Sequence, residues 1–323
     1  MSAFHSNRHS IQELLQARQS GLWNIGGIRS IPAWFKGRKF KFMIRRFILS
    51  AGPLAAALGL VPSAFAQEED HSNLTIGVGG VYIPSYEGSN DYRIIPIAQA
   101  RGKVHDFAFW TRGPALYVDA IPNRAGDSVD FELGPLVNLR FDRTSRKGMK
   151  DDAVRALGKR DMAVEVGGFV GIGKTGVITS AYDNLSARVA VAKDVAGAHQ
   201  GYVITPAIEY MTPLSITTFV GMSVSAEYVS KKYGRYYFDV DGADAAASGL
   251  PVYDRAGDKA GFRKVGVNLT AGKSLSGDIR KGWVVFVLGG YSRMLGRYGD
   301  SPIVSVAGSK DQWVGALGVG YTF

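Results

Sequence analysis

The last eleven residues, 313–323, constrain the fold of this chain more than any other stretch. Side chains alternate between the two faces of a strand, so residues two apart share a face. One face of this segment is large and mostly apolar: Trp313, Gly315, Leu317, Val319, Tyr321 and Phe323. The other face carries small side chains. A soluble sheet would bury the large face, whereas a transmembrane barrel turns it to lipid and places aromatic residues at both interfaces.

The end of the chain also resembles the C-terminal signal that outer-membrane barrels present to their insertion machinery. It stops on an aromatic residue with no polar tail. We therefore predict that the barrel-insertion machinery is a partner. The residues that carry this assembly signal would be Trp313, Leu317, Val319, Tyr321 and Phe323.

The N-terminal part of the chain has the three parts of a secretory signal peptide. A short basic segment begins at Met43, an apolar segment follows, and Ala64-Phe65-Ala66 forms a small-x-small cleavage site. We predict cleavage between Ala66 and Gln67. The apolar segment is too short to span a bilayer. The expected organisation is an N-terminal extension (or over-called start) at 1–42, a signal peptide at 43–66 and a barrel at 67–323.

The positive charge of the chain belongs mostly to this leader. The whole chain has a formal charge of +10, which by itself predicts a nucleic acid or an anionic surface as partner. Residues 1–66 contain nine of the 38 basic and one of the 28 acidic residues, which leaves +2 for residues 67–323. We expect no nucleic-acid partner. The absence of cysteine agrees with an exported chain that uses no disulfides.

Twelve segments after the leader have the length of membrane strands, and the clearest alternation lies at 128–142. The sequence therefore predicts an all-β fold, an antiparallel transmembrane β-barrel of about twelve strands. Ten strands is the alternative if 104–121 is divided wrongly, because such barrels have an even number of strands. The expected strands are 74–83, 93–101, 104–111, 114–121, 128–142, 162–173, 177–193, 200–211, 215–229, 262–274, 281–294 and 313–323.

The connectors support the same fold. Long or polar connectors follow the first, fifth, seventh, ninth and eleventh strands, and short ones follow the second, sixth and eighth. The connectors after the fourth and tenth strands are intermediate, and the short connector Arg112-Gly113 after the third strand is the one misfit. Odd connectors of an antiparallel barrel share one side, and bacterial barrels keep their short turns and both termini in the periplasm. No segment has a helical period. We expect the connector 230–261 to be a solvated loop.

Charged residues on the polar strand faces are predicted to point into the lumen, where charges at membrane depth persist when paired or hydrated. The mixture of signs favours a cross-linked interior over a pore selective for one sign of ion. These residues are Arg93, Arg101, Asp119, Asp130, Glu132, Arg140, Glu165, Arg188, Glu209, Glu227 and Lys264.

One motif invites a different interpretation. The segment 168–175 matches the nucleotide-binding pattern G-x-x-x-x-G-K-[ST]. A phosphate-binding loop must follow a buried strand and open a helix. The residues after Thr175 are β-branched and poor in helix formers, and 168–173 continue the strand alternation. We therefore predict a barrel strand and turn.

No other group of residues predicts a cofactor, a metal site or an enzyme. His105 and Asp106 are adjacent and point to opposite faces of a strand. The acidic residues of 230–261 lack the spacing of a calcium loop. The tyrosines Tyr228, Tyr233, Tyr236 and Tyr237 are expected to form an interfacial girdle rather than a sugar site.

The chain resembles the MipA/OmpV family, the MltA-interacting outer-membrane proteins. The matching segments are Pro84–Tyr92, Ser248–Tyr253, Gly290–Gly296, Asp300–Val304 and Gly318–Phe323. The resemblance implies an outer-membrane barrel in contact with lipid and lipopolysaccharide. It also implies a non-enzymatic scaffold in peptidoglycan and envelope assembly that joins a murein lytic transglycosylase to a penicillin-binding protein. A narrow porin-like channel for small solutes is the alternative function.

Overall fold

The structure is a computed structural model that describes residues 74–104, 107–122 and 129–323. The predicted N-terminal extension, the signal peptide and the cleavage site at Gln67 lie outside these residues. His105 and Asp106 also lie outside them.

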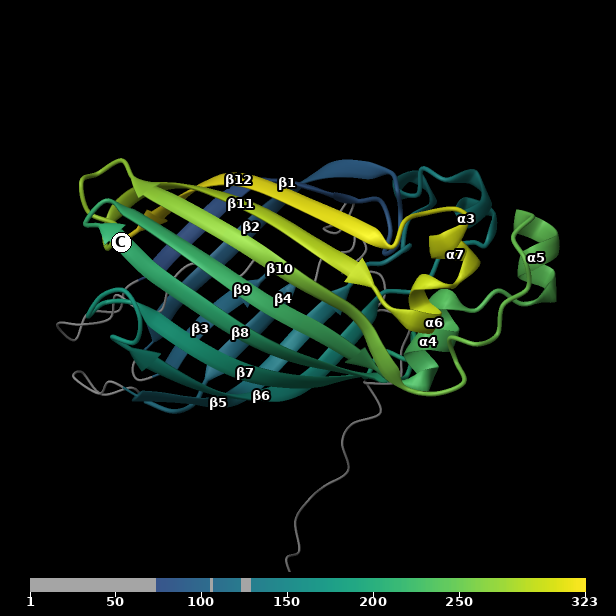
Figure 1. Ribbon diagram of the computed structural model, residues 1–323, viewed down its shortest axis with the longest axis horizontal. Helices are drawn as coiled ribbons and strands as arrows, with labels where there is room; N and C mark the ends of the chain where they lie inside the picture. The colour runs from purple at the N-terminus through teal and green to yellow at the C-terminus, as the bar shows by residue number, and fades with distance from the viewer. Residues whose placement is uncertain (1–73, 105–106, 123–128) are drawn as a thin grey trace, which may run out of the picture. The chain divides into compact units, whose positions relative to one another are not determined.

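The described chain forms a closed barrel of twelve strands, each antiparallel to its neighbours (Figure 1). The barrel closes where β1 pairs with β12, from Thr75 opposite Thr322 to Tyr82 opposite Gly315. The predicted twelve-stranded antiparallel barrel is confirmed. The strands are β1 (Leu74–Pro84), β2 (Tyr92–Val104), β3 (Phe107–Arg112), β4 (Ala115–Asp119), β5 (Val129–Arg140), β6 (Ala163–Thr175), β7 (Asn184–Asp194), β8 (Tyr202–Ser215), β9 (Thr218–Val229), β10 (Gly261–Ser274), β11 (Gly282–Met294) and β12 (Asp311–Thr322).

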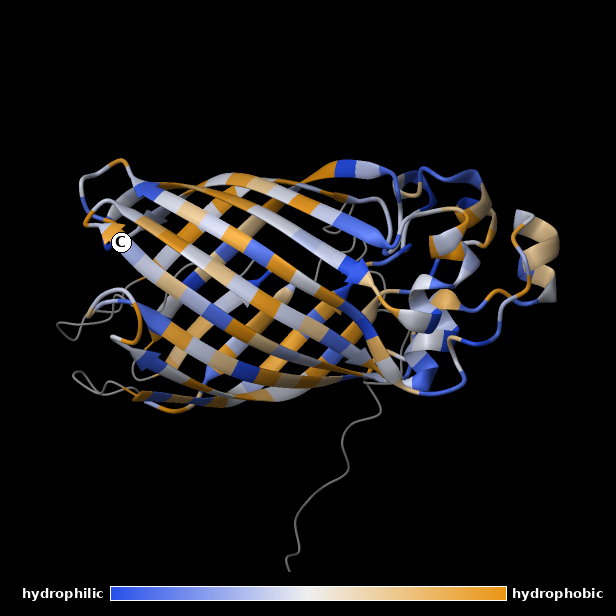
Figure 2. Ribbon diagram, in the orientation of Figure 1, coloured by the Kyte–Doolittle hydropathy of each residue, from blue (hydrophilic) through white to orange (hydrophobic). Residues whose placement is uncertain are grey.

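The alternation seen in the sequence is visible on the strands (Figure 2). Large apolar side chains such as Phe131, Leu133 and Leu317 are exposed on the outer face, while their neighbours point inward. Aromatic pairs mark both ends of this apolar face. Tyr82 stacks on Tyr92 near one end. At the other end, Tyr321 contacts both Trp283 and Phe323 edge to face.

The largest error in the predicted strands is the start of β7, which begins at Asn184 instead of 177. The carboxylate of Asp183 accepts hydrogen bonds from the backbone N–H groups of Val177 (2.6 Å) and Ile178 (2.9 Å). These bonds fold the β-branched residues of the connector into a turn, because a side-chain acceptor competes with the strand ladder. The segment 168–175 lies within β6, with Lys174 paired to Val129 and Leu185.

The long connectors after β1, β5, β9 and β11 form a folded cap at one end of the barrel, opposite the end that holds the C-terminus (Figure 1). The cap contains short helices that the sequence did not predict, because three to eight residues are too few to show a helical period. They are η3 (Arg146–Gly148), α3 (Asp152–Ala156), α4 (Lys231–Phe238), α5 (Gly242–Ser248), α6 (Gly296–Gly299) and α7 (Pro302–Ser305).

Side-chain N-caps fix three of these helices. Asp151 accepts from the N–H of Val154, Ser230 from that of Tyr233, and Asp241 from that of Asp244. None of the helices in the described residues has the length and apolar character needed to span a bilayer.

Two apolar clusters hold the cap together. The first contains Val203, Val229, Tyr233, Tyr237, Phe238, Ala256, Met294, Tyr298 and Val304. The second contains Tyr86, Met149, Val154, Leu157, Val240, Leu250, Ile303 and Ala307. The prediction of a solvated loop at 230–261 was therefore wrong, and so was the assignment of Tyr233 and Tyr237 to an interfacial girdle, since both are fully buried in the first cluster.

Candidate functional site in the barrel interior

All eleven charged residues predicted to line the lumen occupy interior-facing strand positions. Six of them, Asp119, Glu132, Arg140, Glu165, Arg188 and Glu227, are buried. The other five, Arg93, Arg101, Asp130, Glu209 and Lys264, are half-buried. The structure divides most of these residues between two layers, one below the cap and one at the centre of the barrel.

The first layer begins around Glu165 on β6. Its carboxylate accepts hydrogen bonds from Arg140 Nε (2.8 Å) and Asn138 Nδ2 (2.7 Å) on β5. His199, in the connector after β7, lies 3.0 Å from the same carboxylate through Nε2. The N–H of Gly201 donates to His199 Nδ1 (3.0 Å), which leaves Nε2 as the nitrogen that donates to Glu165. Every charge in this group is buried and paired.

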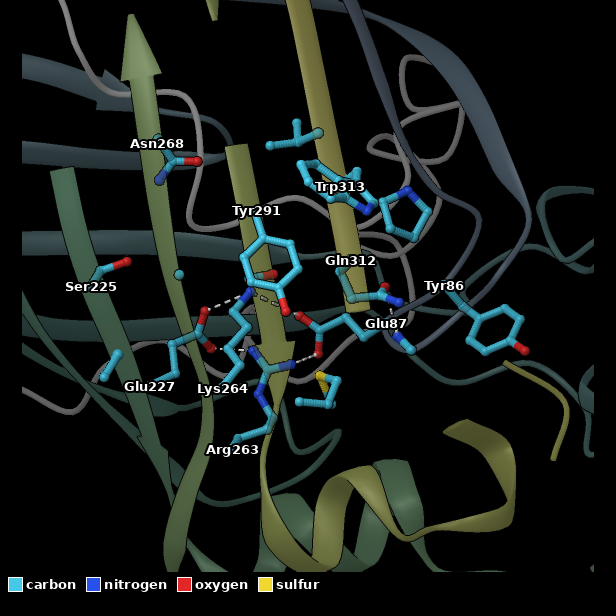
Figure 3. A pocket seen from close by; sticks show the side chains of 17 residues that line it. Tyr86, Glu87, Ser225, Glu227, Arg263, Lys264, Asn268, Tyr291, Gln312 and Trp313 are labelled. Carbon is cyan, nitrogen blue, oxygen red and sulfur yellow. Dashed lines mark hydrogen bonds and ion pairs between the residues drawn. The ribbon is translucent and has the colours of Figure 1, made fainter. Parts of the chain in front are cut away.

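The same layer continues across the lumen to β9 and β10 (Figure 3). Arg263 contacts both Glu87 and Glu227, and Lys264 Nζ lies 2.9 Å from Glu227 Oε1. The hydroxyl of Tyr233, in α4, donates to Glu87 Oε2 (2.9 Å). Arg140 Nη1 on β5 also lies 3.4 Å from Glu87 Oε1, so Glu87 ties the first cap connector to β5, to β10 and to a cap helix.

Glu87 lies in the connector between β1 and β2, and its side chain is held as a carboxylate. Burial alone would raise its pKa, but the positive charges of Arg263, Lys264 and Arg140 outweigh burial and hold the pKa below its usual value. The charge balance around Glu87 thus depends on groups from two separate strands, β5 and β10.

The second layer lies at the centre of the barrel. Arg188 on β7 binds Glu132 on β5 through Nε (2.6 Å) and Nη2 (3.0 Å). Arg112 at the end of β3 makes a two-pronged ion pair with Glu209 on β8. Arg188 Nη1 also lies 3.8 Å from Glu209, so one arginine links the two carboxylates.

Three aromatic rings fill the space beside these ion pairs. Trp110 stacks on Tyr117 with ring centroids 5.7 Å apart, and both rings meet Phe169 edge to face. The guanidinium of Arg188 lies 5.0 Å from the ring of Trp110, within the range of a cation–π contact. Charged and aromatic side chains together occupy the middle of the lumen.

A cavity of about 80 Å³ remains below the cap, between β9, β10, β11 and β12 (Figure 3). Glu227, Arg263, Lys264, Asn268, Tyr291 and Gln312 are among the residues that line it. A second cavity of about 30 Å³, bordered by Gln99, Trp110, Phe219 and Phe286, lies toward the other end. One buried water needs roughly 10–15 Å³ in this measure, so both spaces suit a few waters.

Sequence reasoning missed several residues of this interior, namely Glu87, Arg112, His199 and Arg263. Arg263 precedes Lys264, and strict alternation allows only one of two neighbours to face inward. The pairing of β10 with β9 shifts register between Phe262 and Lys264, and this bulge turns both cations inward. Glu87, Arg112 and His199 lie at or beyond strand ends, where alternation carries no signal.

The described residues contain no group of three or more His, Asp or Glu side chains arranged to hold a metal ion. The ion pairs of the two layers join residues of different strands. The arrangement cross-links the barrel wall, because Glu132, Glu165 and Glu209 each pair with an arginine on another strand.

Comparison with known proteins places the chain in a family. The profile described as MltA-interacting protein MipA matches residues 76–323, which is the whole barrel except the first two described residues. The chain belongs to the MipA family. Together with the closed barrel, this membership places the protein in the outer membrane of a Gram-negative cell. A search of curated proteins found no match.

Several solved outer-membrane barrels are similar in fold at low identity. An outer-membrane channel of Pseudomonas putida F1 is 10% identical, with a TM-score of 0.38, and the match covers 82% of this chain and 100% of that one. The CymD monoaromatic hydrocarbon channel is 11% identical, with a TM-score of 0.35 and coverage of 80% and 90%. The toluene transporter TodX of Pseudomonas putida is 8% identical, with a TM-score of 0.33 and coverage of 84% and 96%.

Proposed function

We propose that this protein is a non-enzymatic scaffold of the outer membrane that holds a lytic transglycosylase and, through it, a penicillin-binding protein near the peptidoglycan layer. The family description names an interaction with the transglycosylase MltA, and this supports the first partner. The second partner comes from the resemblance alone.

The filled interior is the observation that carries this proposal. The two charged layers and the aromatic cluster occupy the described lumen beside cavities of about 80 and 30 Å³, and the cap is packed by two apolar clusters of its own. Moving a solute along the barrel axis would require breaking several buried ion pairs. A barrel of this kind serves better as a rigid platform in the membrane than as an open pore.

The end of the barrel opposite the cap is the side we assign to the periplasm, because it holds the short turns and both ends of the strand series. A peptidoglycan enzyme would meet the barrel there. Ile178 lies in the turn between β6 and β7 at this end, and Val252 lies in the cap at the other. Their side chains are almost equally exposed, 65% and 64%.

This pair of positions gives a matched test in intact cells. The chain has no cysteine, so Ile178→Cys and Val252→Cys each introduce one reactive thiol. A thiol-directed photocrosslinker attached to each should capture the transglycosylase from Ile178→Cys and not from Val252→Cys. Capture from Val252→Cys alone, or from neither position at normal abundance of both proteins, would contradict the proposal.

A narrow channel for small solutes is the second candidate. The two cavities favour a channel, because they show that side chains do not fill the lumen continuously along the barrel. Steady current through the wild-type protein in a planar bilayer would favour the channel over the scaffold.

A further inference from the structure

A patch of three lysines lies at the cap end of the barrel wall, on the side that faces away from the lumen. Lys193 is the tenth of the eleven residues of β7, and its side chain is exposed. Val189 and Val191, which share its face of the strand, are exposed on the outer wall. Lys231 and Lys232 open helix α4 directly after the end of β9, and both are exposed.

The strand pairing brings these three lysines close together. Lys193 lies opposite Tyr202 on β8. The backbone oxygen of Tyr202 accepts the N–H of Ser230 (3.0 Å), which is the residue before Lys231. The two sides of the patch are therefore separated by two strand spacings, or about 10 Å. A lysine carries its ammonium group on a flexible four-carbon stem, so the three ammonium groups can meet one anion at this part of the rim.

The three lysines have no counter-ion in the described part of the chain, since none of them makes an ion pair there. The residue after Lys193 is an acid, Asp194, but its side chain is buried. Its carboxylate accepts the backbone N–H groups of Ala196 (2.9 Å) and Gln200 (2.8 Å) instead. The patch therefore presents positive charge to the outside, in contrast to the lumen, where arginines pair with glutamates.

Lys231 and Lys232 destabilise the helix that carries them. They lie in the first turn of α4, which contains no acidic residue. The N-terminus of a helix carries partial positive charge, so cations there are unfavourable. Ser230 already caps this helix by accepting the N–H of Tyr233, and the ammonium groups are therefore the donors that remain for an anion. An anion bound to the two lysines would remove the cost of their position.

Aromatic side chains place the patch at the level of the lipid headgroups. Tyr202 is exposed on the outer face beside Lys193. Phe262 on β10 is also exposed and meets Tyr228 on β9 edge to face, with ring centroids 5.2 Å apart. Such rings lie where the hydrocarbon of a membrane meets the headgroups. The cap end faces the outside of the cell in the orientation assigned above, so the headgroups here are those of lipopolysaccharide, whose lipid A carries phosphate groups.

We propose that Lys193, Lys231 and Lys232 bind a phosphate group of lipid A, and that the bound lipid braces the cap. The ammonium groups form charge-assisted hydrogen bonds with the phosphate oxygens. α4 buries three aromatic side chains in the first apolar cluster of the cap, so a phosphate shared between α4 and β7 fixes that cluster against the wall. The inference rests on the orientation of the barrel and not on the scaffold role.

The test compares two variants that each lose three exposed lysines. The patch variant combines Lys193→Gln, Lys231→Gln and Lys232→Gln. The matched control changes the same net charge at the opposite end of the barrel, and it combines Lys174→Gln, Lys273→Gln and Lys281→Gln. The control lysines do not gather on one phosphate, because β6 and β10, which carry the first two, are separated by β7, β8 and β9.

Native mass spectrometry of the purified protein in detergent measures the fraction that retains added lipid A. A lysine near an anionic lipid surface strengthens binding about fivefold, so the patch variant should bind bisphosphorylated lipid A roughly a hundredfold more weakly than the wild type. The control should stay within about fivefold of the wild type. Lipid A without phosphates should bind the wild type and the patch variant alike, and inorganic phosphate at the same concentration should not displace the intact lipid. Hydrogen exchange of residues 231–238 should slow when lipid A binds the wild type or the control.

Equal retention of lipid A by the two triple variants would overturn the site, and so would equal binding of the lipid with and without its phosphates. Displacement by inorganic phosphate would assign the lysines to a free anion instead of a lipid. Unchanged hydrogen exchange of residues 231–238 on binding would refute the bracing of the cap. If the patch variant does not assemble as a heat-modifiable barrel, Lys193→Gln alone is compared with Lys174→Gln, with an expected difference of about fivefold.

Discussion

The two faces of β9 give a direct test of the register, because neighbouring residues there meet lipid and lumen. Val224 is the seventh of the twelve residues of this strand, so it lies near the middle of the membrane, and its side chain is exposed on the outer face. Ser225 follows it and lines the cavity that also contains Glu227. Val224→Lys places an ammonium in lipid, while Ser225→Lys places it beside a carboxylate and water.

The expected difference in unfolding free energy between the two variants follows from the position of Val224 near the middle of the membrane. A lysine on the lipid face costs about 2–4 kcal/mol at the midplane of a barrel. A lysine at position 225 faces the lumen, where it meets Glu227 and has room for water. Its cost in unfolding free energy should therefore be smaller by about 2 kcal/mol, which is a factor of up to roughly thirty in the folded-to-unfolded ratio. Gly134 is unsuitable as the inner position, although it also faces the lumen, since an added Cβ would lie 1.8 Å from the carbonyl oxygen of Val118.

The assay is urea unfolding in lipid vesicles, with the folded fraction measured from the mobility of unboiled samples. Val224→Lys should lower the urea midpoint clearly more than Ser225→Lys does, at an unchanged slope. Equal shifts would refute the register, because a slip of one residue exchanges the faces of the whole strand.

Three further predictions concern single residues. Deleting Phe323 should lower the amount of assembled, heat-modifiable barrel and raise its degradation in the periplasm. Thr322→Ser, on the inner face, should do little. Equal assembly of both variants would show that the terminal aromatic residue is not part of the assembly signal. Lys174→Ala should leave assembly and envelope phenotype unchanged, and specific ATP binding by the purified wild type would contradict this. The pKa of Glu87 is lowered in the folded state, so its charge stabilises the fold in full above its usual pKa of 4.5, and this stabilisation is lost as pH falls from there through the lower pKa of the folded state. Hydrogen exchange of the cap helix 231–238 should therefore speed up in acid, and Glu87→Gln should weaken that dependence; an identical pH profile in the variant would contradict it.

The regular part of the wall was readable from the sequence because alternation has a period of two. Residues 129–140 and 311–322 form strands close to the predicted limits, since each has one apolar face and one polar or small face. The start of β7 could not be predicted from the sequence, because residues 177 and 178 are β-branched and favour a strand. The carboxylate of Asp183 accepts hydrogen bonds from their backbone N–H groups and holds them in a turn.

The sequence predicted which charged residues point into the lumen, but not which of them form ion pairs. Residues such as Glu132 and Arg188 lie on polar strand faces, so their inward direction follows from alternation, whereas their partners depend on which strands face each other across the lumen. Arg263 was missed because a bulge breaks the alternation. The cap was missed because its short helices are stabilised by packing between distant connectors, as in the contact of Tyr86 with Ala307.

Current through the wild-type barrel in a planar lipid bilayer tests most directly whether its interior is closed. Both charged layers are intact in this protein, so no steady ohmic current should flow at moderate voltage. Heat-modifiable mobility of the same preparation shows that the inserted protein is the folded barrel. A steady ohmic current from that preparation would contradict the closed interior and, with it, the scaffold role.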